Sequence, residues 1–231
     1  MESLPATAAS GVCQVLSPLV LEGQLVRLEP LDSAHAAPLA DAAAENRASY
    51  GFTWVPDGLD DARRYVEGAL AYQATGRAMP FAVRRVADDR VVGTTRFLDL
   101  QVFTWPPPWP PGVDPGPEPA DDRPPSVAEI GSTWYAASAQ RTGVNADCKL
   151  LMLTHAFEVW RVHRVTFKTD ARNRASRGAI ERLGARPDGV LRAHSPAADG
   201  TIRDTAYYSV LASEWPEVSA GLRRRLTRLA A

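Results

Sequence analysis

The stretch AEIGSTWYAASAQRTGVNADCKLLMLTHA, residues 128–156, decides the fold. Its first part alternates apolar and polar residues and predicts a strand, and its last part predicts an amphipathic helix. A short polar turn at 140–145 joins the two directly. This order points main-chain N–H groups and the positive end of a helix at one spot, an arrangement that binds phosphate oxygens. We therefore expect a phosphate-bearing ligand at this turn.

Outward from this stretch, the apolar patterns predict strands at 25–31, 79–86, 90–100, 127–135, 162–169, 186–194 and 201–211. Helices are predicted at 34–45, 60–73, 143–160, 173–183 and 213–229. The unit from 127 to 169 requires a parallel crossover, whereas the earlier strands are expected to be antiparallel. The fold class is therefore α/β (α+β), with a mixed, mostly antiparallel central sheet and flanking helices. Strands 127–135 and 162–169 should splay apart, and Gly131 marks a bulge or a close approach.

The ends and the middle of the chain differ in composition from the rest. Residues 1–18 lack the basic start and the continuous apolar run of a secretory signal, so we expect a flexible N-terminal arm. Residues 19–231 are long enough for a single domain with its own core. Ten of the 19 prolines lie within residues 105–125. Proline is excluded from the interiors of helices and strands, so this segment is predicted to be a proline-rich loop insertion.

Composition excludes several classes of protein. The chain has 26 basic and 27 acidic residues and a formal net charge of -1, whereas a nucleic-acid-binding protein normally has a basic excess. Its apolar runs are shorter than the roughly 18 residues that a membrane span needs. The two cysteines offer no disulfide framework and fit a reduced compartment. We therefore expect a cytoplasmic protein that binds neither nucleic acid nor a membrane.

Two common phosphate sites can be excluded by their motifs. A dinucleotide-binding turn needs Gly-x-Gly-x-x-Gly directly after a strand, and Gly143 is the only glycine at 140–145. A Walker-type loop needs Gly-Lys-Ser/Thr, which the turn does not contain. The turn must therefore belong to another class of phosphate site.

Three ordered motifs give the chain a resemblance to the GCN5-related N-acetyltransferase (GNAT) superfamily. The run Gln140-Arg141-Thr142-Gly143-Val144-Asn145 is similar to the family's pyrophosphate motif, Gln/Arg-x-x-Gly-x-Gly/Ala, with asparagine in place of the usual small last residue. The run Asn173-Arg174-Ala175-Ser176 opens the next helix, and residues 189–192 and 207–209 mark the last hairpin. The resemblance covers roughly residues 22–215 and is nearer to the subgroup that modifies ribosomal protein N-termini (RimJ/RimL-like).

The resemblance implies the GNAT fold, acetyl-CoA as co-substrate and no metal. Main-chain donors of the turn would hold the diphosphate, and asparagine suits the last position because it is a good helix cap. Asp147 is expected to face away from this anion. Strand 127–135 would pair with the pantetheine arm. The cofactor-binding residues would be Trp134, Tyr135, Gln140, Arg141, Thr142, Gly143, Val144, Asn145, Asn173 and Ser176.

Acetyl transfer to an amine needs a base, a donor for the leaving thiolate and a means of polarising the carbonyl. Two residues are candidates for the base. Glu129 stands where the resemblance implies a catalytic glutamate, and His194 ends strand 186–194 with an imidazole that titrates near neutral pH. Ser176 is the candidate acid. The acceptor site is expected to form from Tyr50, Phe52, Trp54 and Trp105.

These expectations combine into one hypothesis and one alternative. The hypothesis is an acetyl-CoA-dependent N-acetyltransferase that transfers acetyl directly to the amine of a small molecule or a protein N-terminus. The alternative is a coenzyme-A-binding module that has lost catalysis, which Asn145 and the proline-rich insertion motivate. The insertion would either cover the acceptor pocket or contact a second subunit in a homodimer.

Overall fold

The computed structural model of the chain describes residues 17, 19–103 and 123–230. The predicted arm at 1–18 therefore lies, apart from residue 17, outside the described residues. The same holds for the proline-rich insertion at 105–125, apart from its last three residues, and for Trp105 within it.

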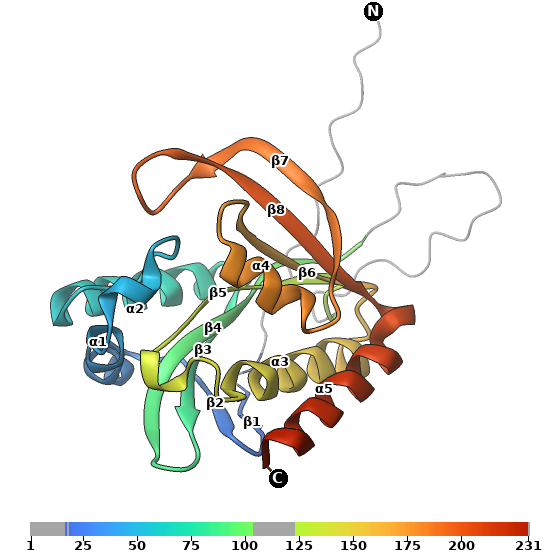
Figure 1. Cartoon of the computed structure of the whole chain (residues 1–231), viewed down its shortest axis with the longest axis horizontal. Coiled ribbons are helices and arrows are strands. Elements are labelled where there is room, and N and C mark those ends of the chain that lie inside the picture. The colour runs from blue at the N-terminus through green and yellow to red at the C-terminus, as the bar shows by residue number, and fades with distance from the viewer. Residues whose placement is uncertain (1–16, 18, 104–122, 231) are drawn as a thin grey trace, which may run out of the picture.

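Eight strands of the described chain form one open sheet in the order β1-β2-β3-β4-β5-β6-β8-β7 (Figure 1). The strands are β1 (Leu21–Glu22), β2 (Val26–Pro30), β3 (Met79–Arg85), β4 (Arg90–Gln101), β5 (Val127–Tyr135), β6 (Arg164–Asp170), β7 (Arg186–Pro196) and β8 (Ile202–Leu211). The helices are α1 (Ala36–Ala44), α2 (Leu59–Ala74), α3 (Val144–Thr154), α4 (Arg174–Glu181) and α5 (Trp215–Ala230), with short helical turns η1 (Ser33–His35), η2 (Arg47–Tyr50), η3 (Ala137–Ala139), η4 (His155–Val159) and η5 (Ala212–Glu214). Neighbouring strands are antiparallel except β5 and β6, which are parallel. The predicted mixed, mostly antiparallel sheet is confirmed.

Strands β5 and β6 stay paired over a very short distance. Residues 127–129 of β5 face residues 164–166 of β6. Beyond these positions β5 continues beside β4, and β6 continues beside β8. The two strands therefore diverge, and main-chain groups on their inner edges are left without a strand partner. This is the splayed pair that the sequence predicts.

The helices cover both faces of the sheet. Helices α1 and α2 pack together, and so do α3 and α5 (Figure 1). Neighbouring residues of β5 show that the two pairs lie on opposite faces, because side chains alternate along a strand. Trp134 packs edge-on against Tyr65 of α2, whereas Thr133 accepts a hydrogen bond from Lys149 of α3. None of the helices in the described chain is both long and apolar enough to cross a bilayer.

A bulge in β5 lies where the strands separate. The register with β4 shifts, so that Ser132 and Thr133 stand opposite the single residue Thr95. Ser132 has a φ of 46°, in the left-handed region that side chains rarely adopt. The predicted bulge is thus present, one residue beyond Gly131. The glycine itself leaves room for Glu129, whose Oε1 lies 2.7 Å from where a Cβ of Gly131 would be.

The helix predicted at 143–160 changes its geometry before it ends. Helix α3 stops at Thr154, and η4 continues as a π-turn in which the N–H of Trp160 donates to the carbonyl of His155. A π-turn brings residues five apart together, and the rings of His155 and Trp160 have centroids 4.5 Å apart. Both rings pack against Phe97. Aromatic packing on β4 therefore accounts for the departure from regular helix.

Gly184 ends the segment that follows α4. Its φ is 99°, and a Cβ there would lie 2.9 Å from Cγ2 of Val218 in α5. Both the backbone and the packing of α5 therefore require glycine at this position.

Gly184→Ala is expected to lower the free energy of unfolding by about 1–3 kcal/mol, because alanine must adopt a positive φ and crowd Val218. Gly178→Ala in α4 is the matched control, since a Cβ there meets only the flexible end of Arg182. The control should raise stability by up to about 1 kcal/mol. Urea unfolding followed by circular dichroism measures both. Equal effects of the two variants would contradict the assigned role of Gly184.

Candidate active site

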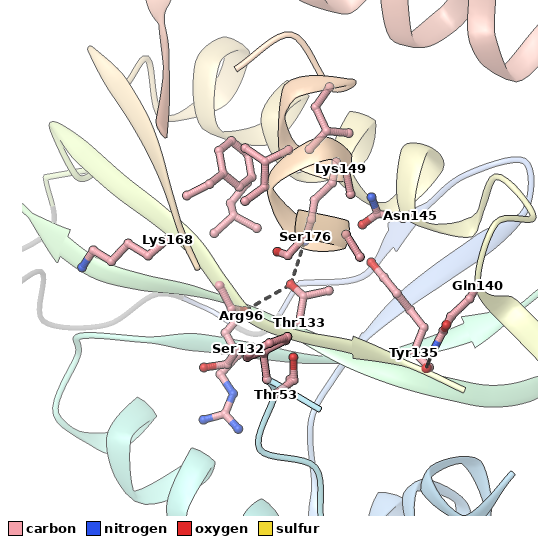
Figure 2. A pocket seen from close by; sticks show the side chains of 18 of the residues that line it. Thr53, Arg96, Ser132, Thr133, Tyr135, Gln140, Asn145, Lys149, Lys168 and Ser176 are labelled. Atoms are coloured by element: carbon pink, nitrogen blue, oxygen red, sulfur yellow. Dashed lines mark hydrogen bonds between the residues drawn. The ribbon is translucent and has the colours of Figure 1, made fainter. Parts of the chain in front are cut away.

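The separation of β5 and β6 opens a cavity of about 1010 Å³ (Figure 2). Its walls come from β4, β5, β6, α2, α4 and the start of α3. The predicted site residues that line it are Phe52, Trp54, Glu129, Tyr135, Gln140, Arg141, Gly143, Asn145 and Ser176. Those outside its lining are Tyr50, Trp134, Thr142, Val144, Asn173 and His194.

Helix α3 begins at the cavity without a side-chain cap. Gly143 precedes the helix with a φ of 97°, and no side chain of the described residues caps its first turn. The first N–H groups of a helix have no partner within the helix, so they are available here. Asn145 faces the cavity, whereas Asp147 turns away and accepts from the N–H groups of Leu25 at 2.6 Å and Val26 at 3.1 Å. The positive end of α3 therefore faces the cavity with Asp147 directed elsewhere, as predicted.

Gly143 is also required by packing beneath the turn. A Cβ would lie 2.9 Å from Cδ1 of Leu25 and 3.0 Å from Cδ1 of Leu229. The first belongs to the residue before β2 and the second to the last turn of α5. Segments far apart in the sequence therefore meet under the start of α3.

The side chains of the polar turn mainly shape the turn itself. Nε2 of Gln140 donates to the carbonyl of Tyr135 at 3.0 Å and to Oγ of Ser49 at 3.1 Å. The hydroxyl of Thr142 donates to the carbonyl of Ala139, the last residue of η3, at 2.7 Å. Arg141 is exposed, has a φ of 64° and lines the cavity. Gln140 therefore ties the turn to the end of β5, and Arg141 adds positive charge beside the helix start.

Buried Glu129 forms an ion pair with the partly buried Lys168 where the strands part. Oε2 of Glu129 lies 2.5 Å from Nζ of Lys168, which also lies 2.9 Å from Oδ2 of Asp99. Glu129 is 8% exposed, and burial raises its pKa to about 7 although Lys168 opposes the shift. Against the lowering effect of burial, the two carboxylates hold the pKa of Lys168 above its ordinary value. A carboxyl group with a pKa near neutrality can accept a proton from a bound acid and release it again.

Lys149 is a second lysine on the cavity wall and, unlike Lys168, is buried, with 4% of its surface exposed. Its Nζ donates to Oγ1 of Thr133 at 2.8 Å (Figure 2) and to Oγ1 of Thr95 at 2.9 Å. Burial lowers its pKa to about 8. The sequence signal for this residue is its spacing, because it lies four residues after Asn145 and shares its face of α3.

The start of α4 supplies another part of the wall. The side-chain oxygen of Asn173 accepts from the N–H of Ser176 at 3.0 Å and so caps the helix. Ser176 lines the same cavity as Lys149 (Figure 2). Asn173 therefore positions α4, and the hydroxyl of Ser176 is the polar group that this helix start presents to the cavity.

His194, the second predicted base, lies on the exposed strand β7. Its Nδ1 is 3.0 Å from Oγ1 of Thr205, and its Nε2 is 3.1 Å from the hydroxyl of Tyr207. The ring of Tyr207 lies 5.2 Å from Nζ of Lys168. These contacts connect His194 to the Glu129–Lys168 pair through Tyr207.

The predicted aromatic residues divide between the core and the cavity. Tyr50 is 8% exposed, donates its hydroxyl to the carbonyl of Tyr135 at 3.1 Å and packs edge-on against Trp134. Trp134 is 3% exposed and faces α2. Phe52 and Trp54 line the cavity and remain 38% and 65% exposed. Tyr50 and Trp134 therefore pack in the core behind the cavity wall. Phe52 and Trp54 lie at the exposed rim of the cavity.

Residues 26–186 match the family model described as acetyltransferase (GNAT) domain. The chain belongs to the GNAT acetyltransferase family. The predicted resemblance and the predicted GNAT fold, with its single parallel pair, are confirmed.

Solved GNAT structures are similar over most of the chain. A GCN5-related N-acetyltransferase from Brucella melitensis is 27% identical with a TM-score of 0.71, covering 90% of this chain and 86% of that one. A protein from T. thermophilus is 32% identical with a TM-score of 0.71, covering 92% and 99%. Mycobacterium smegmatis RimJ, in complex with CoA-disulfide, shares the fold at 19% identity, with a TM-score of 0.71 and coverage of 90% and 95%. No curated protein matches the chain.

Three cationic residues of this GNAT cavity, Arg96, Lys149 and Lys168, belong to no motif in the sequence. Arg96 and Lys168 stand on strands, where alternation marks a polar position but does not distinguish a cavity from solvent. Only the packing of β4 and β6 beside β5 brings them into the site.

The buried amine of Lys149 should make stability depend on pH. From about pH 7.5 to about pH 9.5, the free energy of unfolding should rise by about 2 kcal/mol relative to that of Lys149→Met, because the folded state releases a proton that the unfolded state keeps. The variant leaves no buried hydroxyl unpaired, since Thr95 and Thr133 already lie 2.7 Å apart at Oγ1. Urea unfolding at both pH values measures the difference. Parallel pH profiles of the two proteins would contradict the lowered pKa of Lys149.

Proposed function

We propose that the chain is an acetyl-CoA-dependent N-acetyltransferase that transfers the acetyl group directly to the amine of a small molecule or of a protein N-terminus. One observation carries the proposal. A single cavity joins the uncapped start of α3 to the buried carboxyl of Glu129, whose pKa is raised to about 7. The first can bind phosphate and the second can accept a proton at neutral pH.

The fit of acetyl-CoA to these residues supports the proposal. The start of α3 offers free N–H groups to a diphosphate, and Arg141 adds a cation. The inner edge of β5 beyond residue 129 has main-chain groups that pair with no described strand, so an extended pantetheine chain could bind along it. RimJ, a structural neighbour, is solved with CoA-disulfide. When bound, acetyl-CoA would supply the activated acetyl group.

The residues at the other end of the cavity have separate roles in acetyl transfer. Glu129 accepts the proton that the acceptor ammonium must lose, and Lys168 holds the carboxylate in place. The new bond joins the acceptor nitrogen to the acetyl carbon, and the carbon–sulfur bond breaks. The hydroxyl of Ser176 on the cavity wall can donate to the leaving thiolate.

Direct transfer is favoured over an acyl-cysteine step. Cys148 is fully buried, and burial raises the pKa of its thiol. A raised pKa disfavours the thiolate that a covalent step would need. Glu129 is favoured over His194 as the base because Glu129 lines the cavity, whereas His194 lies outside its lining and has both ring nitrogens near hydroxyls.

The pH dependence of thiol release from acetyl-CoA tests the role of Glu129. The value of kcat/KM should rise with pH and level off above an inflection near 7, where the carboxyl ionises. Glu129→Gln should lower kcat/KM by about 10²–10⁴-fold and abolish its rise with pH around 7. Two acceptors with different amine pKa values should share the inflection. Tight coenzyme binding without thiol release from any amine would favour the non-catalytic module instead.

Lys168→Met provides an independent check that Glu129 causes the inflection of kcat/KM near pH 7. Loss of the hydrogen bond and charge of Lys168 removes the interactions that lower the pKa of Glu129. The inflection should therefore move to higher pH while some activity remains. If the inflection of kcat/KM stays at the same pH in this variant, a group other than Glu129 causes it.

Asn145 provides a test of the phosphate site. Asn145→Asp should weaken coenzyme A binding by about tenfold, since it adds a negative charge at the helix start that faces the diphosphate. Asn145→Ala is the matched control and should bind within about threefold of the native chain. Isothermal titration calorimetry measures both. Equal coenzyme A binding by the two variants would contradict the placement of the diphosphate at the start of α3.

A further inference from the structure

Arg96 is a buried cation in the cavity that the proposed chemistry does not use. It projects from β4, lines the cavity and is 8% exposed. Its Nε has no hydrogen-bond partner among the described residues. Glu129 is the only carboxylate among the described lining residues, and it pairs with Lys168. A buried guanidinium without a counter-ion is costly, so a ligand that supplies the missing charge would be bound favourably.

A second unpaired donor lies next to Arg96. The guanidinium carbon of Arg96 is 4.7 Å from the centroid of the Tyr65 ring. Tyr65 also lines the cavity, and its buried hydroxyl has no partner within the described chain. Guanidinium N–H groups donate two parallel hydrogen bonds to a carboxylate or phosphate, and a phenol can donate a third. The two side chains therefore form a site with unused donors and positive charge.

This site adjoins the base. Arg96 stands opposite Gly131 in the β4–β5 pairing, and the carboxyl of Glu129 lies over Gly131. Directly opposed residues in antiparallel strands have Cβ atoms about 4.5–5.5 Å apart on one face. Figure 2 shows Arg96 and Lys149 on opposite sides of β5, so Arg96 is separated from the face that carries α3. The free cation therefore lies beside the proton acceptor rather than beside the phosphate end.

The other cations near this end of the cavity are engaged. Arg64 pairs with Asp61 at 3.0 Å, and its side chain is 69% exposed. Nε of Arg203 donates to Ser195 and Thr205. Arg96 is thus the buried cation without a matching carboxylate at this end of the described cavity, since Lys149, which has only hydroxyl partners, stands on the α3 side.

We propose that the acceptor carries an anionic group, a carboxylate or a phosphate, close to its amine, and that Arg96 and Tyr65 bind this group while the amine faces Glu129. This inference rests on the proposed function, because it assigns the acceptor of the same reaction. It excludes polycationic amines as good acceptors, since they would face Arg96 and Lys168 without a countercharge.

Matched acceptor pairs test the proposal by thiol release. The pairs are glycine and glycinamide, phosphoethanolamine and ethanolamine, and the tripeptides Asp-Ala-Ala and Asn-Ala-Ala. In at least one pair the anionic member should have the higher kcat/KM by about tenfold or more. The pair that responds identifies the source of the charge as a free carboxylate, a phosphate or a peptide N-terminus.

Variants then assign the preference to this site. Arg96→Gln should make the two members of the responding pair equal acceptors, Arg96→Lys should keep part of the preference, and Tyr65→Phe should reduce it several-fold. Arg64→Gln removes an equal charge at an exposed position and should leave the ratio within about twofold of the native value. A preference that survives Arg96→Gln, or that Arg64→Gln abolishes equally, would overturn the assignment.

A binding readout keeps this inference separate from the proposed function. The Nε–H signal of Arg96 in a ¹H–¹⁵N spectrum of the coenzyme A complex, assigned by its loss in Arg96→Lys, should shift on titration with an anionic acceptor and not with its neutral partner. Equal use of both members of every pair, with no such shift, would overturn the anion site and leave the acetyl transfer intact. If no acceptor caused thiol release, that result would count against the proposed acetyl transfer. The ¹H–¹⁵N titration would still decide whether Arg96 binds an anion.

Discussion

The brevity of the β5–β6 pairing is the constraint on which the rest of the structure depends. Only residues 127–129 face residues 164–166 before the two strands follow different neighbours. Buried main-chain groups must find partners, so a sheet that parts in its middle leaves an edge that an extended ligand can complete. The start of α3 and the carboxyl of Glu129 lie at the cavity this parting creates. The site is therefore a property of the sheet's topology, and the side chains adapt it to a reaction.

The local signals in the sequence were sufficient for much of this arrangement. Alternation located β5, and the polar turn before an apolar helix located the free N–H groups near Gly143. Residues whose role depends on distant partners were less predictable. Tyr50 was expected at the acceptor, yet its hydroxyl binds the end of β5, which the sequence does not reveal because the two lie 85 residues apart. Arg96 is conspicuous only once α2 is known to pack above it.

The two lysines of the cavity wall, Lys168 and Lys149, show how the pKa of one residue type depends on its position in the fold. Lys168 lies between two carboxylates, which hold the pKa of its ammonium above the ordinary value against the effect of burial. Lys149 has two threonine hydroxyls as its hydrogen-bond acceptors, and burial lowers its pKa to about 8. Hydroxyl dipoles solvate a cation less well than a carboxylate does. The lysines of α3 and β6 on the two sides of β5 therefore have opposite pKa shifts, which no property of the sequence near either residue would predict.

The contacts beneath Gly143 bear on how the protein is made. Leu25 and Leu229 approach the same point from segments separated by most of the chain. Contacts of such long sequence separation form late, and a growing polypeptide acquires its structure from the N-terminal side first. During translation, the turn that begins α3 lacks one wall until Leu229 has left the ribosome. The packing beneath this turn is therefore completed only after α5 has been synthesised, well after the residues of the turn itself have emerged.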